Sequence, residues 1–443
     1  MYLDKGLKAV SAFVEPSQFE SIRRHIPPAW VEQALEAAGT ATVRKRRLPA
    51  EQVVWLVIGM AMFRRWPIHD LVGKLDLVLP GGPRATVVPS TVAEARARVG
   101  AEPLEQIFEM GAKKWGHESA RRHAWRGLAM YGVDGSTLRV ADSAENRAHF
   151  GGPSGERGDS GYPLVRVTTL MALRSHILAA ADFGPYSESE IVLSAFLWRE
   201  VPDDSLVLVD RGFLAAGILV PLANEGRNRH WLTRAKSTTK WRVVKRLGRN
   251  EDLVELTVSA QARAQDPSLP ATYLARAIRY QVKGFQPGTI LTSMLDSEQF
   301  PASEIVELYH ERWELELGYD EIKTEMLDRL ESIRSRTVAG VEQELWGILL
   351  AFNLIRLEME RTADDLGVEP TKISFVSALR IVCDTWSWCA LASPGALPTR
   401  LKTMRDLFSR LVLPDRRRSR RYPRAVKIKM SNFPRKRLAH AHP

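Results

Sequence analysis

The chain has 443 residues, of which 45% are hydrophobic and 26% are charged. This composition excludes a disordered tail protein, a collagen-like fibre and a small disulfide scaffold, and the length suggests about three domains of roughly 150 residues each. The formal net charge is +11, and all of that excess lies between Arg416 and Pro443, where eleven residues are Lys or Arg and none is Asp or Glu. This basic tail is either a polyanion-binding arm or a solvated extension.

Two cysteines, Cys383 and Cys389, form no metal-binding motif and no disulfide framework, which favours a reducing cytoplasm. The N-terminus has no basic segment followed by an apolar one, so we expect no signal peptide. The longest apolar run, Val53 to Phe63, is shorter than the roughly 20 residues that a membrane-spanning helix needs. We therefore expect a cytoplasmic protein without a membrane partner.

The first 125 residues are predicted to be helical. One helix is expected from Ala50 to Phe63, and it follows a basic run of four residues, Arg44, Lys45, Arg46 and Arg47. A second helix is expected to start near Pro89 and to end at Gly100, because Thr91 and Glu94 have the spacing of a capping box. It contains Arg96 and Arg98, so this part is either a helix-turn-helix DNA reader or an ordinary packed helix.

Residues 126–330 are predicted to form an α/β core. Strands are expected at Leu128–Val133, Leu164–Leu173, Ile177–Phe183, Leu206–Val209 and Trp231–Thr233, with helices at Glu188–Arg199 and Leu214–Ala223. A β-rich insertion is expected over residues 237–298, followed by one long helix from Ala302 to about Leu330. Residues 331–413 are predicted to be helical and to serve as a possible dimerisation region, and residues 414–443 are the basic tail.

The long helix is predicted to present a polar face. At about 100° per residue, four side chains fall within roughly 60° of each other: Tyr309, Arg312, Glu316 and Lys323. An apolar stripe runs beside them, formed by Leu308, Leu315, Tyr319, Ile322 and Met326. A solvent-facing helix is the alternative, because Arg312 and Glu316 have the i,i+4 spacing of an ion pair. Asp320 lies on the same face, so helical geometry does not choose between Glu316 and Asp320.

Two more acids follow apolar strands. Asp134 comes after Val133, and Asp210 comes after Val209. Functional groups in open α/β sheets gather at the carboxyl ends of strands, although Asp134 could be a turn residue and Asp210 a helix N-cap. Together with one acid from the helix, they could hold two Mg²⁺ ions roughly 4 Å apart, as in phosphodiester displacement. Arg and Lys on the same helix face would bind the flanking phosphates.

These residues match a known signature. Tyr309, Arg312, Glu316 and Lys323 reproduce the Y-x2-R-x3-E-x6-K pattern of bacterial insertion-sequence transposases with a DDE triad, the family named after insertion sequence four. The segments Val133–Thr137 and Val209–Phe213 resemble the regions that carry the first and second Asp of that family. The resemblance selects Glu316 over Asp320. It extends to about residue 360 and includes the N-terminal part around Arg44–Pro49.

The resemblance implies an RNase H-like core and metal-dependent cleavage and joining of DNA, with a hairpin intermediate at the transposon end. It implies that Asp134, Asp210 and Glu316 bind two Mg²⁺ ions, for which Mn²⁺ would substitute, and that Tyr309, Arg312 and Lys323 hold phosphates. Relatives use an aromatic residue of the β insertion to hold a flipped base, for which Trp241 is the candidate, although a packed core Trp is the alternative. The implied partners are double-stranded DNA, as terminal inverted repeats and target, and a second copy of the chain. The implied location is the bacterial nucleoid.

Two other functions share this pattern. A domesticated DNA-binding protein of the same descent would no longer cut, but the presence of all three acids and both cations argues against it. A structure-directed nuclease without strand transfer would use the same site and would need no end-specific domain. Comparing cleavage with joining on one substrate would separate that nuclease from a transposase.

Overall fold

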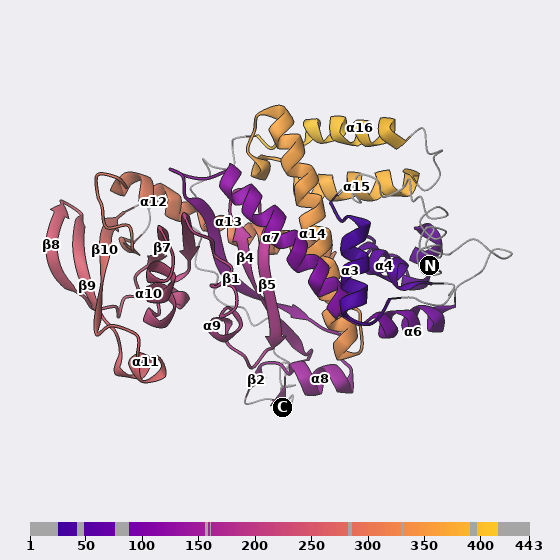
Figure 1. Cartoon of the computed structure of the whole chain (residues 1–443), viewed down its shortest axis with the longest axis horizontal. Coiled ribbons are helices and arrows are strands. Elements are labelled where there is room, and N and C mark those ends of the chain that lie inside the picture. The colour runs from indigo at the N-terminus through magenta and orange to yellow at the C-terminus, as the bar shows by residue number, and fades with distance from the viewer. Residues whose placement is uncertain are drawn as a thin grey trace, which may run out of the picture.

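A nine-stranded sheet runs through the centre of the molecule (Figure 1). The computed structural model describes residues 25–41, 48–75, 88–155, 158–159, 161–281, 286–328, 332–389 and 397–414. The strand order is β5-β4-β1-β6-β7-β11-β10-β9-β8, in which only the β1–β6 and β6–β7 pairs are parallel. In that order the strands are Leu178–Pro185, Leu164–Ala172, Ala129–Arg139, Ser205–Val209, Arg229–Arg234, Gly288–Thr292, Thr272–Tyr280, Glu251–Thr257 and Arg242–Gly248. Two short strands, β2 (Ser154–Gly155) and β3 (Gly158–Asp159), form a separate hairpin.

The β-rich insertion is confirmed as β-rich, but it forms no sheet of its own. Strand β11 pairs with β7, so β8 to β11 extend the central sheet at one end (Figure 1). The parallel strand β6 is buried along its whole length, as its uninterrupted apolar sequence predicted. The inner strands thus form a rigid base, while the outermost strand β8 is largely exposed.

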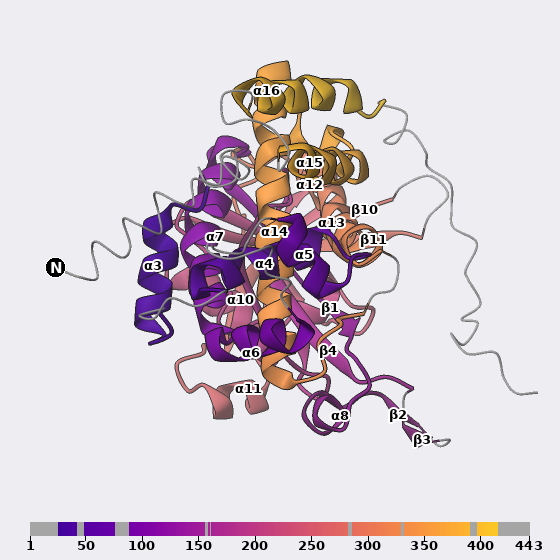
Figure 2. The same cartoon turned by 90° about the vertical axis from the view of Figure 1, so that its right-hand side faces the viewer.

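The N-terminal helices pack on one side of a long helix, α14 (Val338–Leu366), which Figure 2 shows passing through the molecule. Helices α4, α7 and α15 all contact α14. The helices before the sheet are α3 (Pro28–Ala37), α4 (Ala50–Met62), α5 (Ile68–Lys74), α6 (Pro89–Val99) and α7 (Glu102–Arg122). Helix α14 is long and apolar enough to cross a membrane, but 78% of its most apolar window is buried inside the protein, as expected of a core helix.

The remaining helices are shorter. They are α8 (Ala144–Phe150), α9 (Glu190–Leu193), α10 (Ala216–Asn224), α11 (Ala260–Gln265), α12 (Ala302–Glu311), α13 (Trp313–Asp320), α15 (Phe375–Cys389) and α16 (Leu397–Phe408). Among the described residues, 3₁₀ turns cover Arg211–Phe213, Pro370–Lys372 and Ser409–Leu411, and a π-helical turn covers Glu321–Met326. The four-residue α9 replaces the longer helix that we expected from Glu188 to Arg199.

Two expectations about helices are wrong in detail. The helix near Pro89 begins at Pro89 itself with no side-chain cap, so Thr91 lies inside the helix and forms no capping box. Proline at the first helical position needs no N–H partner, and its fixed φ starts the helix without Thr91. The long helix from Ala302 is interrupted at Arg312 and ends in the π-helical turn, so it is not one regular helix.

Candidate active site

Asp134 and Asp210 lie on neighbouring parallel strands. The β1–β6 pairing ends with Val133 opposite Val209, so each aspartate is the next residue on its strand. Strand β6 ends there, whereas β1 continues to Arg139 and pairs Asp134 with Thr169 of β4. The expectation that Asp134 ends a strand is therefore wrong, but both acids directly follow the last paired residues at the carboxyl end of the parallel β1–β6 pair.

The surroundings of Asp134 disfavour its ionised form. Burial raises the pKa of Asp134 to about 6, although the N–H of Gly135 donates to its Oδ1 over 2.8 Å and opposes the shift. The nearby carboxylates of Asp210 and Glu190 raise the pKa further, and Arg312 lowers it. A cation beside Asp134 would favour the ionised carboxylate and so offset both the cost of its burial and the repulsion from its neighbours.

Asp210 also acts as an N-cap, which was its alternative role. Its Oδ1 accepts a hydrogen bond of 2.6 Å from the N–H of Gly212, at the start of the 3₁₀ turn Arg211–Phe213. This bond holds the carboxylate close to the end of β6. The capping role and a ligand role are compatible, because a carboxylate has about four lone-pair positions.

Helix α13 docks directly on β1 beside Asp134. A Cβ at Gly132 would lie 2.7 Å from the Cδ atoms of Leu315, so the helix approaches where β1 has no side chain. The hydroxyl of Tyr319 donates to the backbone oxygen of Asp134 over 2.7 Å. Further along, Lys323 Nζ donates to Ser136 Oγ over 3.3 Å. Helix α13 and the π-helical turn after it, which carry Glu316 and Lys323 and which we call the signature helix, therefore run along β1 from Gly132 to Ser136.

Arg312 lies at the break between α12 and α13 and pairs with Glu316. Its Nη2 donates to Glu316 Oε1 over 2.9 Å, and the Glu316 side chain is 42% exposed. Burial lowers the pKa of Arg312, but Glu316, Tyr309 and Asp134 raise it more, so these groups surround a fixed positive charge. Burial also raises the pKa of Tyr309. Asp320, the competing acid, instead accepts a bond of 2.7 Å from Thr324.

The structure brings two of the three acids together. Across the described residues, no group of three or more His, Cys, Asp and Glu side chains is arranged to hold a metal ion. Glu316 is paired with Arg312 and does not join Asp134 and Asp210 in such a group. The two adjacent carboxylates suit a hard divalent cation, which oxygen ligands bind. The raised pKa of the buried Asp134 shows that a positive charge beside it would be favourable.

Several residues predicted to bind DNA instead contact other parts of the protein or lie outside the described residues. Arg96 is partly buried and donates to Gln343, Ser335 and Gly340, contacts that favour packing over an assignment to DNA. Arg98 donates to the backbone oxygen of Leu48, which likewise favours packing over DNA reading. Trp241 lies within the β insertion and is partly buried against an apolar cluster of the central sheet. The remaining basic residues, Arg44, Lys45, Arg46 and Arg47, and the tail from Arg416 lie outside the described residues.

Sequence reasoning missed two neighbours of Asp134. Ser136 holds Lys323, and its signal was its position two residues after Asp134, on the same face of the strand. Glu190 packs against Gly135, where a Cβ would lie 2.5 Å from its Cγ, and it also accepts from Arg166. No sequence pattern linked Glu190 to Asp134, because the two are far apart in the chain.

Comparison with known proteins identifies the family. Residues 16–109 match the family described as insertion element 4 transposase N-terminal, and residues 131–354 match the transposase DDE domain. The chain is 37% identical to "Transposase InsG for insertion sequence element IS4" of Escherichia coli (strain K12), over 98% of each chain. It is 36% identical to "Putative transposase InsZ" of the same organism, over 49% of this chain and 72% of that one.

One solved structure is more distantly similar. The piggyBac transposase synaptic complex with hairpin DNA has a TM-score of 0.42 and 10% identity, covering 91% of this chain and 87% of that chain. The family assignment instead follows from the two matched regions and the full-length relative. The chain belongs to the IS4 family of DDE transposases and is a DNA-cleaving enzyme of that family.

Proposed function

We propose that this transposase cleaves the ends of its insertion sequence and joins them to target DNA with Asp134, Asp210 and Glu316. The observation that carries the proposal is the adjacency of Asp134 and Asp210, whose repulsion and burial raise the pKa of Asp134 to about 6. Strongly perturbed carboxylates of this kind mark functional sites. The signature helix, docked beside them through Leu315 and Tyr319, supports the same centre.

DDE domains use divalent metal ions, and here we propose two Mg²⁺ ions held by the three acids, with Mn²⁺ as a substitute. Such ions activate a water or hydroxyl nucleophile and stabilise the leaving oxygen when bound. To hold these ions together with Asp134 and Asp210, Glu316 would have to give up its ion pair with Arg312. Its exposed side chain allows this change of partner. Arg312 is then released to bind a phosphate oxygen.

The other signature residues would hold the DNA backbone. Tyr309 lies on α12, Arg312 at the break before α13, and Lys323 in the π-helical turn after it. We propose that they fix the phosphates near the cut so that the freed 3′-OH can attack the opposite strand and form a hairpin. A flipped base would then need an aromatic partner. Trp241 is partly buried, so Trp313, which is 40% exposed next to Arg312, is the better-placed candidate.

The architecture supports an RNase H-like core. Three antiparallel strands, β5, β4 and β1, are followed by the parallel strands β6 and β7, and the acids stand at the β1–β6 boundary. We propose that residues 1–125 form the DNA-binding N-terminal domain, residues 126–330 the catalytic core and residues 331–413 a dimerisation region. A homodimer would join two inverted repeats in the synaptic complex.

The test uses DNA that contains the inverted repeats flanking the gene. Purified protein with Mg²⁺ is expected to give double-strand breaks at the repeat edge with hairpinned ends, seen on a denaturing gel, and Glu316→Gln is expected to give none. Asp320→Asn is the matched control on the same helix face and should cleave normally. Specific binding without cleavage in Mg²⁺ or Mn²⁺ would support a silent DNA-binding protein, and cleavage without joining would support a nuclease.

A further inference from the structure

The turn between β4 and β5, residues 173–177, lies against the signature helix. Its backbone is closed by two bonds of 2.8 Å, from His176 N to Ala172 O and from Ala172 N to Ile177 O. His176 has a positive φ of 63°, an uncommon conformation for a residue other than glycine. The turn therefore fixes the directions of two side chains, Arg174 and His176.

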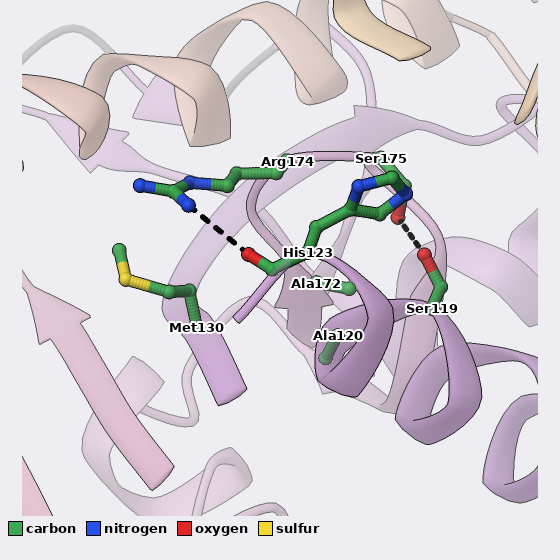
Figure 3. A pocket seen from close by; sticks show the side chains of 7 residues that line it. All are labelled: Ser119, Ala120, His123, Met130, Ala172, Arg174 and Ser175. Atoms are coloured by element: carbon green, nitrogen blue, oxygen red, sulfur yellow. Dashed lines mark hydrogen bonds between the residues drawn. The ribbon is translucent and has the colours of Figure 1, made fainter. Parts of the chain in front are cut away.

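Arg174 holds the end of α12. Its Nε and Nη2 both donate to the carboxylate of Glu311 over 2.9 Å, a two-point contact directly before Arg312. Its remaining nitrogen, Nη1, donates to the backbone oxygen of His123 at the end of α7 over 3.1 Å, which Figure 3 shows as a dashed line. In the same view Ser119 of α7 donates to Ser175 of the turn over 2.7 Å. The guanidinium thus connects the end of α12, directly before the helix break, to the β4–β5 turn and to the end of α7.

His176 holds both ends of α13. The imidazole is 2% exposed, and its Nε2 lies 2.9 Å from Glu314 while its Nδ1 lies 3.1 Å from Glu321. Glu321 begins the π-helical turn that contains Lys323, and it also pairs with the buried Arg356 of α14. One imidazole therefore connects the first turn of α13 to the segment that presents Lys323.

These contacts occupy the face of the helix opposite Glu316. Glu314 and Glu316 are about 200° apart around an α-helix. Close approach on the inner face depends on Gly318, where a Cβ would lie 2.5 Å from Met171 Cε of β4. Arg174 and His176 therefore contact Glu311, Glu314 and Glu321 on the face away from Glu316. Glu316 stays exposed and able to change partners.

We infer that Arg174 and His176 are positioning residues for the DDE site, which set the place of Arg312, Glu316 and Lys323 relative to Asp134 and Asp210. The inference rests on the proposed role of Glu316. Contacts to groups beside a metal ligand, rather than to the metal, commonly affect activity by 10- to 100-fold. Neither side chain touches DNA or metal in this role, so their effect is on geometry alone.

The experiment separates positioning from folding and from DNA binding. Full-length wild type, Arg174→Ala, Arg174→Lys and His176→Asn are compared, because Asn tolerates the positive φ at position 176. Binding to end DNA is measured in Ca²⁺, and the cleavage rate is measured at saturating DNA over a range of Mg²⁺ concentrations. We expect an unchanged Kd for DNA, cleavage slower by about 10- to 100-fold in Arg174→Ala and His176→Asn, and a higher Mg²⁺ requirement. Arg174→Lys should recover part of the rate.

A second readout is independent of turnover. Without DNA, Mn²⁺ should raise the Tm of the wild type, and the rise should be smaller in His176→Asn. Glu304→Gln is the matched control: Glu304 is on the same helix α12 and accepts two bonds from Arg126, which is not a signature residue, so this variant should cleave normally.

Two results would overturn the inference: wild-type cleavage by both Arg174→Ala and His176→Asn, or a loss of cleavage that only follows a matching loss of DNA binding and Tm. The role of Glu316 is tested separately in the same assay. If Glu316→Gln cleaves like the wild type, the proposed triad fails, and Arg174 and His176 then have no catalytic acid to position.

Discussion

At the scale of single residues, the ionised form of Asp134 destabilises the folded protein. Its pKa is raised by burial from 3.8 to about 6, so the folded state binds a proton more tightly than the unfolded state does. The resulting penalty is absent below the unfolded pKa, grows as the pH rises between the two values and is complete above pH 6. A cation bound beside Asp134 would offset the repulsion between these carboxylates.

Replacing Asp134 by Asn should therefore stabilise the metal-free protein while abolishing cleavage. At pH 7.5 the free energy of unfolding should rise by roughly 2–3 kcal/mol, because one pKa unit corresponds to about 1.4 kcal/mol. At pH 3.5 the variant and the wild type should unfold alike. Urea denaturation at both pH values checks this, with the exposed Asp365→Asn as a control that changes neither. Equal stability of Asp134→Asn and wild type at pH 7.5 would contradict the buried repulsion.

At the scale of elements, the active site depends on how closely α13 approaches β1. The approach needs Gly132, because any side chain there meets Leu315. The hydrogen bond from Tyr319 to the backbone oxygen of Asp134 then fixes the position of α13 relative to β1. Side-chain volume at one strand position thus controls where Glu316 lies.

Gly132→Ala should push α13 away from β1. We expect a loss of about 1–3 kcal/mol of stability from overpacking, together with a fall in the cleavage rate at saturating DNA. Gly217→Ala is the control, because a Cβ at that helical glycine meets only Leu269, at 4.0 Å, and alanine favours helices. Urea denaturation and cleavage assays measure both effects. In the double variant Gly132→Ala, Leu315→Ala the loss of stability should be smaller than the sum of the two single losses, because removing the Leu315 side chain removes the clash. A strictly additive loss would argue against this contact.

At the scale of the whole molecule, α14 joins the N-terminal helices to the segment that follows the active site. The buried Glu344 accepts hydrogen bonds from Arg64, from Ser335 and from the N–H of Arg334, and the charge of Arg64 together with these bonds lowers the pKa of Glu344 despite its burial. Arg334 in turn donates to backbone oxygens of Met60, Arg64 and Trp66. A single carboxylate therefore balances cations from distant parts of the chain.

Glu344→Gln should strongly weaken the contact between α14 and the N-terminal helices, because it leaves the guanidinium groups of Arg64 and Arg334 without a counter-charge. Breaking a buried ion pair typically costs about 3–5 kcal/mol. Hydrogen exchange should then quicken over residues 50–75 more than in the central sheet. The control is Asp328→Asn, which removes the exposed pair with Arg65 between the same two regions and should leave the unfolding midpoint unchanged. Uniform exchange across the protein in Glu344→Gln would contradict a local joint.

The sequence predicted much of the secondary structure for local reasons. The apolar run of β6 and the helix from Ala50 both appear close to their expected bounds, because such patterns reflect burial along a short segment. It failed where distant segments decide the outcome. Arg96 looked like a DNA-reading residue, but it packs against Gln343 and Ser335, and no pattern within the short helix α6 could show that partner.

The sequence by itself determined the residue types of the candidate site, their order along the chain and the family to which the chain belongs. Only the tertiary structure decided that Asp134 and Asp210 are neighbours, that Glu316 pairs with Arg312, that the insertion continues the central sheet, and that one turn holds the signature helix from behind. The physical reason is range. Periodicity and capping act over a few residues, whereas strand pairing and buried ion pairs join segments that meet only when the chain folds.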